Sequence, residues 1–281
     1  MNVSDVVVPR AQQRKARRSK ITSLSRNGLD GEQLKLHRAL ARRHLHKSWV
    51  WSALFVPLLV SLGLILLAPK LLDGWHFVIS YFMPLLGLDG TVGVTNQLGG
   101  VKLPISVTWL ELKVGAPTMG QWYWGFGLTA LACLVSFFLP ASWIPLAYVL
   151  RIGSIVMASA LAYFEISPAT FPYSPADHIS TLIIGWLGLA IITPLVFGLT
   201  YNILEFKRRS KALLLILSIV FMLIAAPLLA LAHAIILTYG SLLYQPVLFL
   251  FFSLFPGLSA LICFYSWAMT WEPERNREAV L

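Results

Sequence analysis

Charged side chains are scarce in this sequence, and their scarcity excludes a water-soluble protein. Asp, Glu, Lys and Arg make up 12% of the 281 residues, whereas apolar residues make up 57%. An average soluble domain carries about 25% charged residues. Cysteine is almost absent as well. Because Cys133 and Cys263 fall inside apolar runs, we expect two buried thiols and no disulfide framework.

Motifs of catalytic, cofactor and metal sites are also missing. The sequence holds no Walker phosphate loop, no G-x-S-x-G nucleophile motif and no H-E-x-x-H zinc motif. We therefore expect no cofactor and no metal, and a non-catalytic protein rather than an enzyme. The basic N-terminal segment has no aromatic residue before Trp49 that would stack on bases, so nucleic acid is not an expected partner.

Six apolar runs are long enough to cross a bilayer. About 20 apolar residues span the roughly 30 Å hydrocarbon layer as an α-helix, and lipid offers no hydrogen bonds to the backbone of any other open structure. The sequence thus predicts an all-α polytopic membrane protein whose transmembrane domain covers residues 48–270. The six expected spans are 49–68, 122–140, 143–164, 179–203, 212–237 and 247–270. The alternative for 122–140 and 143–164, which are joined by a very short turn, is a re-entrant pair, and this alternative leaves four full crossings.

The distribution of Lys and Arg predicts the orientation of these spans. Cytoplasmic segments collect basic residues. With the N-terminus inside, 18 of them lie in inner segments and three in outer segments. Trp and Tyr gather at the expected ends of the spans, as in the aromatic belts of membrane proteins. We expect an integral protein of a bacterial inner (plasma) membrane with both termini in the cytoplasm.

Twelve basic residues precede the first span and form an N-terminal arm. Residues 1–30 have no apolar period and are predicted to be a disordered basic tail, and residues 31–47 a basic amphipathic juxtamembrane helix. Residues 271–281 form a short cytoplasmic C-terminal tail. Anionic lipids of the inner leaflet are expected partners, since they attract each such residue by about 1 kcal/mol. The residues assigned to this lipid surface are Lys35, Arg38, Arg42, Arg43, Lys207, Arg208 and Arg209.

The outer loop 69–121 is predicted to hold a small interfacial helix and a β-hairpin. Residues 74–88 are apolar but too short to span, which favours a helix in the membrane interface. Residues 101–109 alternate between apolar and polar side chains with the period of a strand, and residues 91–96 offer a partner. After Trp109 the apolar phase slips, which predicts a bulge or a change of face.

Four polar residues are candidates for function inside or near the spans. Arg151 lies within the third expected span, where its side chain either snorkels to the headgroups or faces a cavity or partner. His233, His178 and Glu165 map to the outer boundary, and they form an outer-face site only if the helices bring them together. For His233 the alternative is a hydrogen-bonded packing residue.

Small residues at four-residue spacing predict close packing between helices. One ladder lies on the third expected span and another on the fifth. Their members are Ser154, Ala158, Ala162, Ala226, Ala230 and Ala234.

Three functions remain open from the sequence. The leading hypothesis is a non-catalytic inner-membrane scaffold or anchoring subunit of an envelope complex for polymer synthesis, export or macromolecule transfer. Its expected partners are other membrane or periplasmic subunits, because the outer hairpin suits edge pairing. The alternatives are a transporter or channel component that uses Arg151, and a membrane-embedded enzyme with an outer-face site around His233.

Overall fold

The computed structural model describes residues 47–98, 100–168, 171–200 and 208–269, which all belong to the compact unit Lys47–Leu281. The predicted tail 1–30, the C-terminal tail 271–281 and all but Lys47 of the juxtamembrane helix lie outside the described residues. So do Lys35, Arg38, Arg42, Arg43 and Lys207. Arg208 and Arg209 open a long helix, in which the Arg209 side chain is exposed.

Most of the described chain is helical. The long helices are α2 (Lys47–Leu85), α3 (Met119–Phe138), α4 (Ile144–Ile166), α5 (Pro175–Thr200), α6 (Arg208–Gly240) and α8 (Phe255–Met269). Five described segments, Leu54–Leu85, Ala141–Ile166, Pro175–Thr200, Arg209–Gly240 and Leu242–Ala268, are long and apolar enough to span a membrane. These segments indicate an integral membrane protein and confirm the predicted helical class. Helix α3 is not one of the five; its first two turns carry polar and interfacial side chains, including Gln121.

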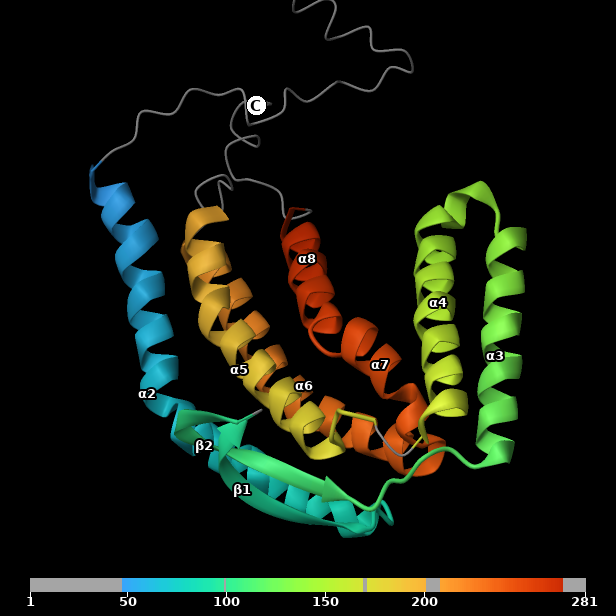
Figure 1. Ribbon diagram of the computed structural model, residues 1–281. Helices are drawn as coiled ribbons and strands as arrows, with labels where there is room; N and C mark the ends of the chain where they lie inside the picture. The colour runs from blue at the N-terminus through green and yellow to red at the C-terminus, as the bar shows by residue number, and fades with distance from the viewer. Residues whose placement is uncertain (1–46, 99, 169–170, 201–207, 270–281) are drawn as a thin grey trace, which may run out of the picture. The chain divides into compact units, whose positions relative to one another are not determined.

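Helix α2 is longer than its sequence suggests. The prediction of a separate interfacial helix over 74–88 is wrong, because one helix of 39 residues continues through Pro69 to Leu85. Figure 1 shows this helix changing direction part-way along its length. Pro69 lacks one backbone donor and crowds the preceding turn, which bends a helix without ending it. Beyond the bend, Trp75 is buried and its indole Nε1 donates to the Leu223 carbonyl at 2.8 Å.

The predicted hairpin is confirmed as a two-stranded antiparallel sheet. Strands β1 (Gly90–Leu98) and β2 (Val101–Leu112) are joined at Gly100, whose φ of 82° favours glycine. The register irregularity lies opposite Thr95–Gln97 and not after Trp109. The buried positions of β2 do change phase between Val107 and Leu110, which agrees with the predicted change of face. The facing stretch of β2 includes Pro104, which has no N–H to give to the ladder.

Helices α2, α5 and α6 pack with β2 around the largest group of buried residues, here called the helix–hairpin core. Ala226, Ala230 and Ala234 are all fully buried in it, as the ladder on the fifth expected span requires. Side chains also reach across the core to backbone carbonyls. Ser61 Oγ donates to the Ile191 carbonyl at 2.7 Å, and Ser180 Oγ donates to the Thr108 carbonyl at 3.1 Å.

Helices α3 and α4 form an antiparallel pair, visible side by side in Figure 1. Trp122 Nε1 donates to the Leu161 carbonyl at 3.1 Å near one end of the pair. The small-residue ladder predicted for α4 does not form its packed face. Ser154 is buried, but Ala158 and Ala162 are exposed. The buried side instead follows larger residues spaced three or four apart, namely Met157, Leu161 and Phe164.

The last apolar run, predicted as the span 247–270, lies within a segment long and apolar enough to span a membrane, Leu242–Ala268, but it is not one continuous helix. It comprises η4 (Leu242–Tyr244), α7 (Gln245–Val247), a π-helical turn labelled η5 (Leu248–Phe252) and α8. The break falls at Ser253, whose ψ of −82° is not helical. Trp186 Nε1 on α5 donates to the Ser253 carbonyl at 2.8 Å and so satisfies a group that the break leaves without a helical partner.

Candidate functional site

Two of the predicted polar candidates, His178 and His233, meet in the helix–hairpin core. His178 Nε2 lies 3.0 Å from His233 Nδ1, and the ring planes are within 10° of each other with centroids 5.2 Å apart, so the rings meet edge to edge. Both residues are buried, with 5% and 1% of their surfaces exposed. At this distance one imidazole N–H donates to the bare nitrogen of the other.

The start of helix α5 positions His178. The Ser174 hydroxyl accepts from the Asp177 N–H and donates to its carboxylate at 2.8 Å, which caps the first turn. The His178 N–H donates to the Ser174 carbonyl. On α6, His233 is next to Ala234 and three residues after Ala230, which are both fully buried. These alanines let the two helices approach closely enough for the rings to touch.

Two buried side chains, His233 and Gln245, each carry a polar atom that has no hydrogen-bond partner among the described residues. His233 Nε2 is buried without a hydrogen-bond partner among the described residues, although the backbone of Phe252 lies beside the ring. Gln245 on α7 is also buried. Its Nε2 donates to the Ser174 carbonyl at 3.3 Å, while its Oε1 has no partner in the described chain. Sequence reasoning missed Gln245, although it is a lone polar side chain in an apolar run.

Glu165 does not join the histidines. It lies one residue before the end of α4, and its side chain is exposed. The three-residue constellation of His233, His178 and Glu165 is therefore not assembled in the described structure. The described residues also hold no group of three or more His, Cys, Asp and Glu that could bind a metal.

Arg151 binds the end of the neighbouring helix. Its Nε donates to Ser136 Oγ at 3.3 Å and its terminal NH2 nitrogen to the Ser136 carbonyl at 3.2 Å. The guanidinium also lies 4.7 Å from the Phe137 ring centroid. Ser136 belongs to the last turn of α3, where free carbonyls favour a cation. The contacts fit the structural role of a half-buried arginine at a helix end.

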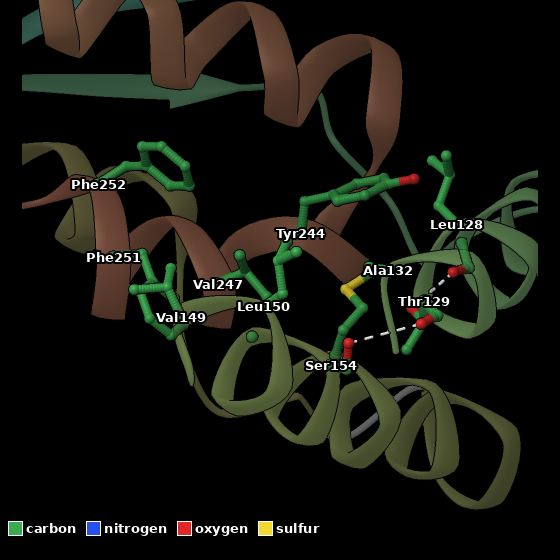
Figure 2. A pocket seen from close by; sticks show the side chains of 13 residues that line it. Leu128, Thr129, Ala132, Val149, Leu150, Ser154, Tyr244, Val247, Phe251 and Phe252 are labelled. Carbon is green, nitrogen blue, oxygen red and sulfur yellow. Dashed lines mark hydrogen bonds between the residues drawn. The ribbon is translucent and has the colours of Figure 1, made fainter. Parts of the chain in front are cut away.

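An apolar groove of about 240 Å³ lies between the α3–α4 pair and the broken last segment. Figure 2 shows Tyr244 and Phe251 on one side, and Ser154 and Thr129 on the other. The Ser154 hydroxyl already donates to the Thr129 carbonyl at 3.5 Å. Arg151 does not line this groove.

Strand β1 is an edge strand with its outer side unpaired among the described residues. The sheet has two strands, and β2 makes most of the contacts with α2 and α5. None of the nine residues of β1 is buried. Its sequence GTVGVTNQL contains no charged residue and no proline, the side chains that usually protect an edge from pairing with another strand.

A comparison of the chain with protein-family models, with curated proteins and with solved structures finds no match.

Proposed function

We propose that this protein is a non-catalytic scaffold or anchoring subunit of a membrane-bound envelope complex. The observation that carries the proposal is the unprotected edge of β1. An extended segment of a partner adds to such an edge through main-chain hydrogen bonds, while side chains on alternate positions give specificity. The proposed partner is therefore another membrane or periplasmic subunit with an extended segment.

The packing of β2 supports this role because it holds the edge in place. Leu110 on β2 is fully buried against the helices, and the Thr108 carbonyl accepts from Ser180 on α5. An isolated two-stranded hairpin is marginally stable in water. Here the contacts of β2 with the helices stabilise the hairpin, so the unpaired edge of β1 is held in one position.

The proposal includes six membrane crossings with both termini in the cytoplasm of a bacterial cell. Helix α3 would be the crossing additional to the five candidate segments. Its 20 residues give a length of about 30 Å at 1.5 Å per residue, which matches the hydrocarbon layer. Contacts with α4 near both of its ends, at Trp122 and at Ser136, support a paired crossing. The excess of basic residues on one side supports the orientation.

Affinity purification from native membranes tests the scaffold. We expect specific envelope subunits to copurify with the wild-type chain. Val94→Lys should reduce their recovery at least fivefold, because a charge in the middle of an edge strand opposes strand addition. Val94 is 58% exposed, so the substitution should leave the fold intact.

Val101→Lys is the matched control. Val101 is an equally exposed valine of the same hairpin, at 65%, but it begins β2 beside the turn. It should copurify the same proteins as the wild type. Recovery of no specific partner, or equal losses with both variants, would overturn the edge-pairing scaffold.

The alternative functions stay predictions. For the transporter, the bonds between Arg151 and Ser136 provide a structural explanation for the arginine that needs no ion pathway. For the enzyme at the outer face, the observation in favour is the contact between His178 and His233.

A further inference from the structure

The contact between the two histidines limits how many protons they hold together. When both rings are neutral, one N–H fills the 3.0 Å gap between His178 Nε2 and His233 Nδ1. Protonating both rings would place two N–H groups opposite each other and two positive charges in contact. Two like charges in a buried site strongly disfavour each other. Protonation of both rings is therefore incompatible with the observed contact between Nε2 of His178 and Nδ1 of His233.

Burial adds a second restriction. Neighbours of the pair on α5 and α6, such as Ile179 and Ala234, are fully buried, and the half-exposed ring of Phe249 lies 6.0 Å from that of His178. A charged imidazole in such surroundings lacks the hydration that stabilises it in water. Uptake of protons therefore requires water to enter, and repulsion between two charged rings favours separation of α5 and α6 there.

No neighbouring charged group stabilises a positive charge on the histidine pair. The titratable side chains on the adjoining parts of the packed elements are Asp73 and His76 on α2, Glu111 on β2, Asp177 on α5, Tyr239 on α6 and Tyr244 on η4. None of them forms a hydrogen bond or ion pair with either imidazole in the described structure; the Asp177 carboxylate accepts from Ser174 and that of Glu111 from Thr91. Lys70 and Lys102 are exposed.

We propose that His178 and His233 form a proton-binding site that keeps the hairpin-side ends of α5 and α6 together while neutral and separates them when protonated. Imidazole in water titrates near pH 6.5, so the separated state binds more protons than the packed state below that pH. The packed state is then favoured at neutral pH and loses stability as the pH falls. Each proton taken up shifts the equilibrium by up to about tenfold per pH unit.

The hairpin responds to this separation because Ser180 is two residues from His178. Ser180 is 1% exposed, and its hydroxyl holds the Thr108 carbonyl of β2. Opening at the histidines therefore exposes Ser180 and loosens β2 from α5. A thiol at this position reports the event directly.

The test measures the reactivity of a Ser180→Cys reporter in a chain whose two native cysteines are replaced by alanine. The full-length protein in lipid nanodiscs is treated with a small pyridyl disulfide, which reacts at acidic pH. Each rate is divided by that of the same variant unfolded in detergent at the same pH, which removes the effect of thiol ionisation. A matched control is Thr193→Cys, fully buried on the same helix but 15 residues from His178.

We expect the normalised rate at Ser180→Cys to rise between pH 7 and pH 5 by about tenfold per pH unit or more, with no comparable rise at Thr193→Cys. Replacing both histidines by glutamine should abolish the rise, because glutamine keeps polar amide groups but does not titrate. A flat profile at Ser180→Cys or equal rises at both reporters would overturn the proposal. A rise that persists in a folded double-glutamine variant would overturn it too. The first two outcomes need no histidine substitution, so they decide the matter even if that variant fails to fold.

Discussion

The helix–hairpin core and the α3–α4 pair are both built from largely apolar helices, but the core encloses a central helix, α5, whereas neither helix of the pair is enclosed to that extent. In α5, 50% of the most apolar window is buried, against 28% in α6 and in the segment containing α4, 22% in α2 and 17% in the broken last segment. The core is also crossed by side-chain hydrogen bonds to distant carbonyls, such as that from Ser61 to Ile191. In lipid, apolar character alone does not bring helices together; small residues and polar contacts do.

A tryptophan substitution in each region should give the largest difference. Trp186→Ala removes a ring that is 1% exposed, together with its bond to Ser253. We expect this substitution to lower the free energy of unfolding by about 2–4 kcal/mol. Moving a side chain from lipid into the protein gains little, but the cavity left by the missing ring still costs packing energy. Trp124→Ala on α3, where the ring is 74% exposed, should change the free energy of unfolding by less than about 0.5 kcal/mol. Unfolding in mixed micelles measures both.

Equal losses of unfolding free energy in the two tryptophan variants would contradict this comparison. They would show that the Trp124 side of α3 is as tightly packed as the core, although the described structure has no contact that buries it.

Alanine enlargement should give a smaller contrast. Ala230→Leu inserts three carbons at a fully buried position and should cost about 1–3 kcal/mol. Ala158→Leu on the exposed side of α4 should change the stability of the purified chain by less than about 0.5 kcal/mol. Thermal unfolding in detergent compares them. A loss at Ala158 comparable to that at Ala230 would show that another molecule packs on this side of α4.

A surface cysteine should have the smallest effect on stability. Its labelling also determines whether α3 crosses the membrane. Ser142→Cys is exposed in the turn between α3 and α4, and in a chain without native cysteines it should cost less than about 0.5 kcal/mol. Six crossings predict that an impermeant thiol reagent labels it only from the cytoplasmic side. Val101→Cys in the hairpin should be labelled only from the other side. Labelling of both from one side would contradict a full crossing by α3.

The helical class and the hairpin could be predicted because they depend on local patterns. Apolar runs of spanning length and an alternation with period two are visible in any stretch of ten to twenty residues. The buried alanines at positions 226, 230 and 234 follow from the same kind of local spacing. The continuation of α2 through Pro69 could not be predicted from the sequence, because proline ends some helices and only bends others.

The histidine contact could not be predicted from depth alone. His178 and His233 are 55 residues apart, and their positions along the chain place both near one boundary of the spans without fixing which way each helix is rotated. For the same reason the ladder with Ala158 was assigned to a packed side that it does not occupy. The break at Ser253 lies three residues before Pro256. Because a proline marks a helix start as well as a kink, it indicates an interruption of the run without fixing its form.

The support of the hairpin by α5 has a consequence for biosynthesis. Thr108 and its donor Ser180 are 72 residues apart, and at 5–20 residues per second about 4–14 s pass between their synthesis. During that interval the hairpin has emerged, but the helix that covers its apolar side has not yet been made. The hairpin therefore completes its folding only after α5 is inserted, and its edge becomes a fixed template for a partner no earlier than that.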